Sequence, residues 1–462
     1  MKCQYKNFYF TNRDDLNIAY DFENNKIISY PLTVNLRNVL AKLSENLDIE
    51  FSDDERDLYN YLKMNLKEVD EAQFNSYDYL EKNGFQITSA SLMIAQNCNL
   101  HCTYCYGGDS GQYHSSKSLM TKEVAKLAIK RLVQDNRKDS EIVINFFGGE
   151  PLMNFDLIQF VVNECKSCYP QSKFAFSLTT NTTLINSEIA DFFKENCFRV
   201  MVSIDGYKEI HNHHRKFRNG TGSFDKVIEG IQILKEKGVE FRIRATLDHR
   251  FYDKYQEIND FLKSLGSDRV TISRLVNYND DQLTFPLNIS DIKYESAQLK
   301  AYLENAVKEA LAGKFPRNFP YISHFKKIVF AERSLMNCGA YEGGTAISSD
   351  GKYYPCHRFV GMEDFDFGDV FNGVNKEKLE KQLSSLDENT RYCNKCFGKY
   401  ICQRSCFRDL AKSGGRYIQH DPEYCQLLKD TVDDALLTYY LILVKRPEFF
   451  NTKLLIEDNN LS

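Results

Sequence analysis

The sequence predicts an α/β fold whose centre is a partial, TIM-like (β/α)6 barrel. Between residues 90 and 276, strand-like segments alternate six times with helical ones. Several of the strand candidates are continuous apolar runs, which is typical of parallel strands buried on both faces. The segments on either side break this alternation, and 462 residues suffice for two to four domains of roughly 100–200 residues each. The strand candidates are Ser91–Ala95, Ile142–Phe147, Lys173–Thr179, Phe198–Ile204, Glu240–Thr246 and Arg269–Leu275.

Residues 1–86 are predicted to form a separate N-terminal unit. Two strand-like runs, Leu16–Phe22 and Lys26–Tyr30, flank Glu23-Asn24-Asn25, which is a hairpin signal. Helical patterns follow at Leu36–Leu47, Asp54–Leu66 and Ala72–Lys82. The unit therefore has a small sheet followed by helices.

The helices of the barrel carry their own start and stop signals. In the segment Phe224–Lys237, Ser223 suits the N-cap and Gly238 suits the C-terminal stop. A second helix, Lys254–Leu265, stops at Gly266. Six βα repeats favour a parallel, partly closed barrel, whose active site lies beyond the carboxyl ends of the strands.

The C-terminal part of the chain is less regular. A helix is expected at Ile292–Ala312, a cysteine-rich segment runs from 338 to about 426, and a last helix covers 427–445. Metal sites can hold such irregular segments where a hydrophobic core cannot. The predicted boundaries are 1–86 for the N-terminal unit, 87–310 for the barrel, 311–430 for the cysteine-rich domain and 431–462 for the C-terminal helix and tail.

Charge and hydropathy argue against nucleic-acid and membrane partners. The net charge of -5 provides no basic footprint. The N-terminus, MKCQYKNFYF, has no apolar signal core. The longest apolar run, from Ala435 to Val444, is far shorter than the roughly 20 residues that span a bilayer. We expect a cytoplasmic protein.

Fourteen cysteines indicate metal or redox sites in a large protein of this kind. Three lie between 98 and 105 and seven between 338 and 425, and clustered thiols indicate ligation of a common centre. The four outside these groups are Cys3, Cys165, Cys168 and Cys197. We expect Cys165 and Cys168 to be buried as small hydrophobes, and we expect no catalytic role for Cys3 and Cys197.

The first group, Cys98, Cys102 and Cys105, directly follows the first barrel strand. Four thiolates saturate a [4Fe–4S] cluster, so three leave one iron open to another ligand. A zinc site would need a fourth protein ligand, for which His101 or His114 is available. Spacing alone leaves both interpretations open.

Here the sequence resembles the radical S-adenosylmethionine (SAM) superfamily, whose signature is CxxxCxφC with an aromatic residue at the position of Tyr104. Further motifs follow in the expected order at strand ends. They are Gly148-Gly149-Glu150-Pro151, Thr180-Asn181, Ser203-Ile204-Asp205-Gly206, and His211 to Arg215, which resembles HDxxR with Asn212 in place of Asp. The replacement leaves the contact made at that position open.

The resemblance implies a SAM-binding site and radical chemistry. The GGEP turn is expected to bind the SAM amino group, and Ser203 and Asp205 are expected near its ribose. The implied cofactor-binding set is Tyr104, Gly148, Gly149, Glu150, Pro151, Asn181, Ser203, Asp205 and Arg215. In the family, the reduced cluster cleaves SAM to a 5′-deoxyadenosyl radical, which takes hydrogen from an unactivated carbon.

The second cysteine group resembles the SPASM domain, which binds two auxiliary [4Fe–4S] clusters. The pattern is C-x12-G-x4-C from Cys338 to Cys356, followed by C-x2-C-x5-C-x3-C-x18-C from Cys393 to Cys425. A zinc ribbon explains the CxxC pair but not the ordered set of seven. The resemblance assigns Cys393, Cys396, Cys402 and Cys425 to the second cluster.

The SPASM resemblance assigns Cys338, Cys356 and Cys406 to the first auxiliary cluster. Residues 330–337 lack the additional cysteine of fully ligated relatives, so we expect an open iron there, unless His324 or His357 closes it. The chain is thus expected to hold three [4Fe–4S] clusters and SAM.

The expected substrate is a ribosomal precursor peptide. The N-terminal unit resembles the RiPP recognition element, a winged-helix-like fold that binds a leader peptide as an added strand. We expect a peptide maturase that forms Cys thioether crosslinks, of the sactipeptide or ranthipeptide type, with a reductant such as flavodoxin or ferredoxin. The alternatives are a sulfatase-maturating, formylglycine-forming enzyme, a carbon–carbon peptide cyclase, and a non-catalytic redox protein.

Overall fold

The fold is taken from a computed structural model of the chain. It describes residues 2–13, 16–22, 26–29, 34–44, 51–65, 89–105, 118–136, 140–267, 269–275, 303–314, 321–330, 338–341, 343–402, 406–412, 416–417 and 422–451, with single residues 76, 78, 80, 87 and 107.

The centre of the molecule is an eight-stranded sheet that contains the six predicted parallel strands in sequence order. They are β5 (Ser89–Ala95), β6 (Glu141–Gly148), β7 (Lys173–Thr180), β8 (Arg199–Ser203), β9 (Phe241–Leu247) and β10 (Val270–Arg274). The prediction of a parallel βα sheet is confirmed. Two strands of the cysteine-rich region extend it: β11 (Gly344–Ile347) pairs in parallel with β5, and β12 (Tyr353–Tyr354) pairs antiparallel with β11. The sheet therefore joins the barrel to the cysteine-rich region.

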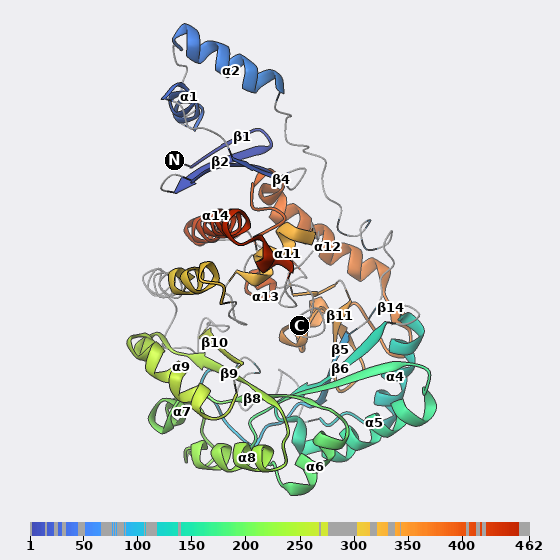
Figure 1. Cartoon of the computed structure of the whole chain (residues 1–462). Coiled ribbons are helices and arrows are strands. Elements are labelled where there is room, and N and C mark those ends of the chain that lie inside the picture. Colours follow the sequence, from blue (N-terminus) through green and yellow to red (C-terminus); the bar gives the residue numbers. More distant parts are fainter. Residues whose placement is uncertain are drawn as a thin grey trace.

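Helices cover the outer face of the barrel (Figure 1). Their apolar faces are buried against the strands; in α8, for example, Val227, Ile231 and Leu234 are all buried. Burial of such a stripe is the main reason that an amphipathic segment is stable as a helix. The barrel helices are α4 (Lys122–Asp135), α5 (Phe155–Cys168), α6 (Ser187–Glu195), α7 (Lys208–His214), α8 (Phe224–Glu236) and α9 (Tyr255–Ser264).

The N-terminal unit contains a four-stranded antiparallel sheet, two strands more than the sequence indicated. The order is β1 (Lys2–Tyr5), β2 (Phe8–Arg13), β3 (Leu16–Asp21) and β4 (Lys26–Ser29), and the predicted hairpin is β3–β4. Helices α1 (Val34–Ser44) and α2 (Asp53–Asn65) follow. The third predicted helix, Ala72–Lys82, falls almost wholly outside the described residues.

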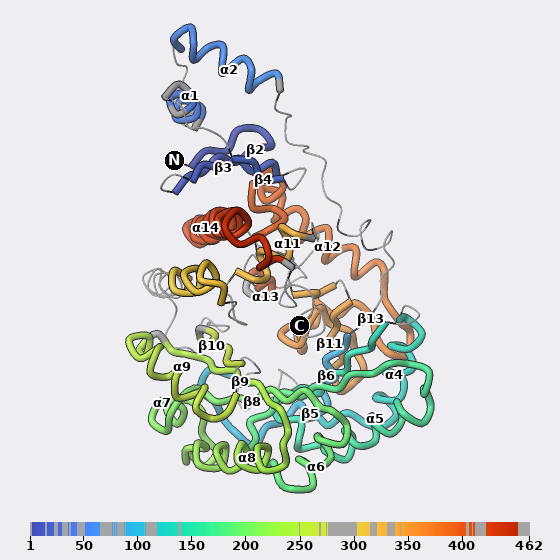
Figure 2. The backbone as a smooth tube through the Cα atoms, viewed as in Figure 1, coloured from blue at the N-terminus to red at the C-terminus, as the bar shows by residue number. Residues whose placement is uncertain are grey.

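The C-terminal part lies between the barrel and the N-terminal sheet (Figure 2). Its helices are α11 (Ile322–Phe330), α12 (Lys376–Thr390), α13 (Phe407–Leu410) and α14 (Pro422–Lys445), and its hairpins are β13 (Gly368–Asp369) with β14 (Gly373–Val374) and β15 (Ala411–Lys412) with β16 (Arg416–Tyr417). Short 3-10 helices cover Pro151–Asn154, His249–Lys254, His357–Phe359, Glu363–Phe365, Arg391–Lys395 and Pro447–Asn451. The helix predicted at Ile292–Ala312 is described only from 303 and is helical over 303–311.

The N-terminal sheet shares a hydrophobic core with the C-terminal part. Tyr9 and Tyr20 from the sheet, and Phe22 directly after β3, pack in one cluster with Val432 and Leu436 of α14. The helix predicted at 427–445 is α14, which begins earlier because proline suits a first helical turn.

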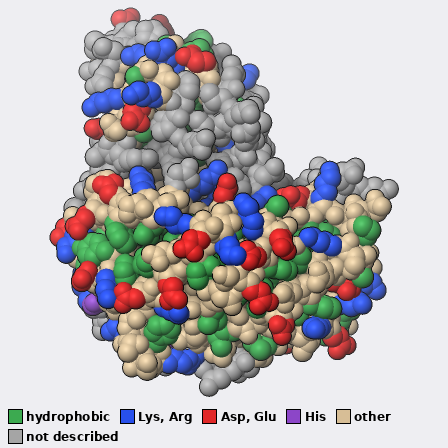
Figure 3. All heavy atoms as spheres, turned by 60° about the horizontal axis from the view of Figure 1, so that its bottom comes forward, with side chains coloured by type: hydrophobic (Ala, Val, Ile, Leu, Met, Phe, Trp, Pro, Cys, Tyr) green, Lys and Arg blue, Asp and Glu red, His purple; other side chains and the backbone are tan. Residues whose placement is uncertain are grey.

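The surface carries charges of both signs. Lys and Arg side chains are interspersed with Asp and Glu over the barrel face in Figure 3. In the parts of the chain that the structure describes, no helix combines the length and the apolar character needed to cross a membrane.

Candidate active site at the carboxyl edge of the barrel

The loop with the first three cysteines starts where β5 ends, at the carboxyl edge of the sheet. Within it, the Cys105 N–H donates to the Cys102 carbonyl at 3.1 Å, and the Leu100 N–H points at Cys98 Sγ at 3.4 Å. Burial raises the pKa of all three thiols, that of Cys98 to about 12. Three half-buried thiolates close together are stable only beside strong positive charge, so this donor set suits a thiophilic metal cluster.

The Gly-Gly pair after β6 is required by a close backbone approach. Gly148 has φ 142°, and a Cβ there would lie 2.1 Å from the carbonyl oxygen of Ala95. A Cβ on Gly149 would lie 2.3 Å from the Asn97 carbonyl oxygen. The Gly149 N–H donates to Ala95 at 2.7 Å and the Glu150 N–H to Asn97 at 2.9 Å. The turn thus fixes the start of the cysteine loop.

Glu150 ties the end of β6 to the end of β7. Its buried carboxylate accepts hydrogen bonds from the Thr180 hydroxyl at 2.8 Å, the Asn181 N–H at 2.8 Å and the Leu152 N–H at 3.1 Å. Burial outweighs these bonds and raises the pKa of Glu150 to about 7. Pro151, also buried, starts the 3-10 turn that follows.

Asn181 lies against the cysteine loop. Its side-chain amide donates to Asn99 Oδ1 at 2.9 Å and lies 3.8 Å from Cys98 Sγ. Its own Oδ1 accepts from the Thr183 N–H at 3.0 Å. The structure therefore brings this predicted SAM contact next to Cys98, the first of the three cysteines predicted to hold a cluster.

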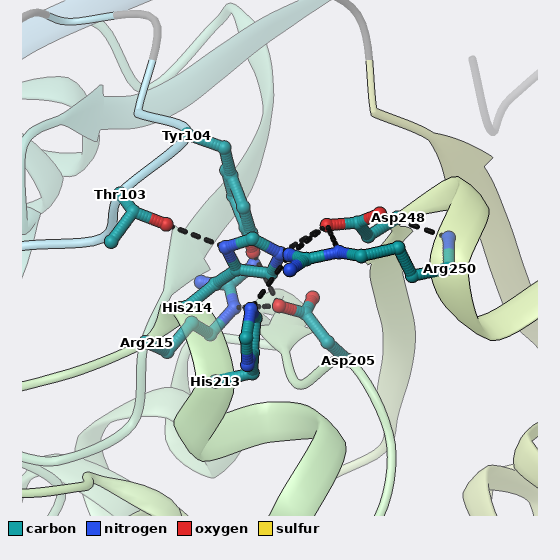
Figure 4. A network of polar contacts seen from close by, with 8 residues as sticks. All are labelled: Thr103, Tyr104, Asp205, His213, His214, Arg215, Asp248 and Arg250. Carbon is teal, nitrogen blue, oxygen red and sulfur yellow. Dashed lines mark hydrogen bonds and ion pairs between the residues drawn. The ribbon is translucent and has the colours of Figure 1, made fainter. Parts of the chain in front are cut away.

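The side chains of Tyr104 and Arg215 converge on the buried carboxylate of Asp205 (Figure 4). The Tyr104 hydroxyl donates to Asp205 Oδ2, and Arg215 Nε donates to the same atom at 2.9 Å. Burial alone would raise the pKa of Asp205, but the Arg215 guanidinium holds it below its usual range. Ser203, at the end of β8, is half-buried nearby in sequence.

Asn212 has a structural role that accounts for its place in the HDxxR-like segment. Its Oδ1 accepts from the Phe224 N–H at 3.0 Å, at the start of α8. A Cβ on Gly222 would lie 2.2 Å from the Asn212 side chain, so glycine is needed there. An amide oxygen satisfies this N–H as a carboxylate would, which answers the question left open by the replacement.

A second network of polar side chains, which the sequence did not reveal, contacts the loop that carries the first three cysteines. Thr103 Oγ1 lies 2.5 Å from His214 Nδ1, and His214 Nε2 lies 2.9 Å from Asp248 Oδ2. Arg250 donates to Asp248 at 2.5 Å and contacts His213 Nε2 at 2.6 Å (Figure 4). The two histidines and Asp248 are spaced for a metal ion, but the Arg250 guanidinium already supplies the positive charge there.

Arg218 was also missed. Its Nε and Nη2 donate to the Cys98 carbonyl at 3.0 and 2.9 Å, and Nη2 donates to Asn97 Oδ1 at 3.1 Å. The available signal was weak: polar residues follow the strand ends, but nothing local links position 218 to position 98.

Four cysteines of the second group line one cavity. Cys393, Cys396, Cys402 and Cys425 surround it together with Lys399 and Lys429, among others. Burial raises the pKa of Cys396 to about 11, and charges on Cys393 and Cys402 act in the same direction. The structure thus brings together the set that the SPASM pattern assigns to one cluster.

The other three cysteines of that group also lie near one another. Burial raises the pKa of the Cys356 thiol, and the nearby thiols of Cys406 and Cys338 act in the same direction. His357 follows Cys356 and its ring lies 4.5 Å from that of Phe147 on β6, whereas His324 packs against Tyr321. Residues 331–337 are outside the described part.

The remaining cysteines divide by exposure. Cys3 and Cys165 are buried, as expected for Cys165, and burial raises the pKa of Cys3 to about 11. Cys168 and Cys197 are exposed. The prediction that Cys168 is buried was wrong. It occupies the last position of α5, about one helical turn after Cys165, which is the last buried residue of that helix.

Comparisons with known proteins agree with this geometry. Residues 92–265 match the model of the radical SAM superfamily. A cysteine-type anaerobic sulfatase-maturating enzyme of Clostridium novyi (strain NT) is 30% identical over 339 residues, which cover 70% of this chain and 88% of the relative.

Two solved structures share the fold. Native anSMEcpe with bound AdoMet and Cp18Cys peptide has a TM-score of 0.61 at 24% identity, covering 78% of this chain and 99% of its own. Streptococcus suis SuiB bound to precursor peptide SuiA has a TM-score of 0.50 at 14% identity, covering 92% and 99%. Both likenesses show the fold alone.

Proposed function

The chain belongs to the radical SAM superfamily, and from that premise we propose that it is a maturase of ribosomal precursor peptides that forms Cys thioether crosslinks. Its class is a radical SAM peptide-modifying enzyme with SPASM-like cysteines. SAM on a reduced [4Fe–4S] cluster supplies hydrogen-atom abstraction from an unactivated carbon. The protein supplies binding, orientation and a water-poor site.

Cys98, Cys102 and Cys105 would hold that cluster, and the motif residues around them would hold SAM. Asn181 lies beside Cys98, and the Tyr104–Asp205–Arg215 group lies where the loop meets the end of β8. Replacing all three cysteines with Ala should abolish 5′-deoxyadenosine formation in reconstituted, reduced enzyme. Formation at the wild-type rate would show that the site is misassigned.

The observation that carries the choice of reaction is the set of three cysteines, Cys338, Cys356 and Cys406, beside the barrel. Three thiolates on a four-iron cluster leave a place for a soft ligand, and a peptide thiolate is such a ligand. The contact of His357 with Phe147 supports a position for this set close to the end of β6. A thiolate held there would be near the carbon that loses hydrogen.

The direct test is mass spectrometry of a Cys-containing precursor after turnover. Each thioether removes two hydrogens from the peptide and one thiol from the alkylatable pool. Iron analysis should give about twelve irons per chain if three cubane clusters are present. A peptide that loses two hydrogens but keeps every thiol would instead support carbon–carbon crosslinking.

For substrate recognition, we propose that the leader peptide adds as a strand to β4. This strand is an edge of the described sheet, and Ile28 on it is 52% exposed. Exposed edge strands are the usual sites of strand addition. The likeness to SuiB, which was solved with a precursor peptide, covers 92% of the chain, so it includes part of residues 1–86.

Formylglycine formation is the second candidate, and the similarity to the Clostridium novyi enzyme favours it. The discriminating assay offers a sulfatase-derived Cys peptide and a leader-bearing precursor to the same enzyme. Aldehyde formation on the first peptide, without thioether formation on the second, would replace the thioether proposal.

A further inference from the structure

The first strand of the N-terminal unit contacts the loop that carries Cys396. Gln4 of β1 donates its side-chain amide to the Lys395 carbonyl at 2.5 Å and accepts from the Phe397 N–H at 3.1 Å. These two backbone groups belong to the two peptide planes on either side of Cys396. One carboxamide, 391 residues away in sequence from Lys395, thus holds both planes.

Holding both planes constrains the backbone of the cysteine between them. A residue has two soft backbone dihedrals, and those of Cys396 are φ -86° and ψ 136°. The direction of its Cα–Cβ bond follows from them, and the thiol lines the cavity shared with Cys393, Cys402 and Cys425. The Gly398 N–H also points at Cys396 Sγ, at 3.4 Å.

Gln4 on β1 pairs with Tyr9 on β2, and both strands are fixed to the C-terminal part. The Tyr9 ring stacks on that of Phe397 with centroids 3.6 Å apart, and the Tyr9 hydroxyl donates to Asp433 of α14 at 3.0 Å. Lys2 forms ion pairs with Asp430 at 2.9 Å and Asp433 at 3.0 Å. The strand of Gln4 is therefore held by its one neighbouring strand, β2, and, through Lys2 and Tyr9, by the helix that carries Cys425.

We propose that Gln4 is a positioning residue for the second auxiliary cluster, which makes the N-terminal unit a structural part of that cluster site. The inference rests on the proposed function in one respect, the assignment of Cys393, Cys396, Cys402 and Cys425 as ligands of one cluster. It goes further, because it links the unit proposed to bind the leader to a cofactor site by direct hydrogen bonds.

The test compares Gln4→Met with Gln426→Met in the full chain. Methionine keeps the length of glutamine but neither donates nor accepts in its place. Gln426 of α14 lines a groove together with Gln4 and Phe397, and its side-chain amide donates to Asp430 at 3.3 Å, so its variant is a matched control. In metal-free protein, Cys396 of Gln4→Met should be alkylated several-fold faster than in the wild type, and Gln426→Met should not change the rate.

In reconstituted protein, Gln4→Met should lose iron and the paramagnetic signal of the second auxiliary cluster, measured in a background without Cys98, Cys102 and Cys105. Gln4→Glu, which keeps the acceptor but places a carboxylate against the Lys395 carbonyl, should behave in the same way. Wild-type alkylation of Cys396 in both variants would overturn the proposal. If the wild type holds no cluster on these cysteines, the ligand assignment fails, and alkylation still decides the role of Gln4.

Discussion

Asp205 and Arg215 form a buried ion pair that joins the end of β8 to the segment after α7. The distance from Arg215 Nε to Asp205 Oδ2 is 2.9 Å, and the exposed fractions of the two side chains are 12% and 1% for Arg215 and Asp205 respectively. The Thr246 N–H donates to the other carboxylate oxygen at 2.9 Å. The pair therefore links β8, β9 and, through Tyr104, the cysteine loop.

Removing one member of this pair should be costly. Asp205→Ala leaves the Arg215 charge buried without its partner, and such changes cost about 3–5 kcal/mol of unfolding free energy. We expect a marked fall in Tm and weaker SAM binding. Asp225→Ala, which breaks the exposed pair with Lys208, is the control and should cost less than about 1 kcal/mol. Equal effects of the two variants in denaturant titrations would contradict this account.

Glu150 should make the unfolding free energy of the metal-free protein depend on pH. Its folded pKa, about 7, lies above the ordinary value of 4.5, so the folded state binds the proton more tightly. Its contribution to stability is therefore fully present below pH 4.5 and is lost as the pH rises to 7, by about 3 kcal/mol in total.

The measurement is the unfolding free energy of wild type and Glu150→Gln between pH 5 and 8. A neutral amide cannot ionise, so the difference between the two proteins should shift in favour of Glu150→Gln as the pH rises. Glu188→Gln, on the first turn of α6, serves as the control. Parallel curves for wild type and Glu150→Gln would show that Glu150 does not titrate in this range.

The role of Glu150 could be predicted from the sequence, whereas that of Arg218 could not. The barrel strands were predictable because each is a local strand-like segment and several are continuous apolar runs, and Glu150 was found because its turn directly follows one of them. Arg218 reaches Cys98 across 120 positions, and Gln4 reaches Lys395 across 391. Such contacts depend on how the elements pack, which local patterns do not encode.

The missed strands have a local explanation. β1 and β2 are joined through Lys6, which has φ 51°, and Asn7. A Gly or Pro at this turn would have marked the hairpin, but neither is present. The pairing of β11 with β5 could not be predicted either, because these strands are separated by about half of the chain.

Arg218 should stabilise the loop that carries Cys98, although it belongs to no recognised motif. Arg218→Met removes the donors to the Cys98 carbonyl and Asn97, so we expect faster loss of iron to a chelator and weaker SAM binding. Lys226→Met is the control, because Lys226 pairs only locally with Glu229 at 2.7 Å among the contacts described. Wild-type rates of iron loss in Arg218→Met would show that the loop holds its shape without this side chain.

Leader recognition is better tested at β4 than by deleting residues 1–86, since deletion also removes Gln4. Ile28→Glu places a charge on the exposed edge of the sheet and should weaken modification of full-length precursor at low concentration. Turnover of a leaderless core peptide at high concentration should stay the same. Val444→Glu is the matched control, an exposed apolar residue on α14 with 61% exposure. Equal KM values for the precursor in both variants would argue against recognition at this edge.

The last prediction concerns the auxiliary cluster assigned to Cys338, Cys356 and Cys406. In a variant without Cys98, Cys102 and Cys105, electron paramagnetic resonance reports the auxiliary clusters alone. Adding a Cys-containing precursor should change the signal, because a peptide thiolate loses its proton and binds as metal ligands do. The same precursor with Cys replaced by Ser should leave the spectrum unchanged.

His357 is the competing ligand for this cluster, since it follows Cys356. Burial lowers the pKa of His357 to about 4, so its ring is neutral at pH 7, the form that binds metals. If His357 closes the cluster, His357→Ala should alter the spectrum without peptide and create the response to precursor. If the peptide is the ligand, His357→Ala should leave both the resting spectrum and the response in place. The spectra could also stay the same with and without peptide, both with His357 present and in His357→Ala. That result would remove the main support for thioether formation, because no peptide sulfur would then be bound beside the reacting carbon. It would favour carbon–carbon crosslinking.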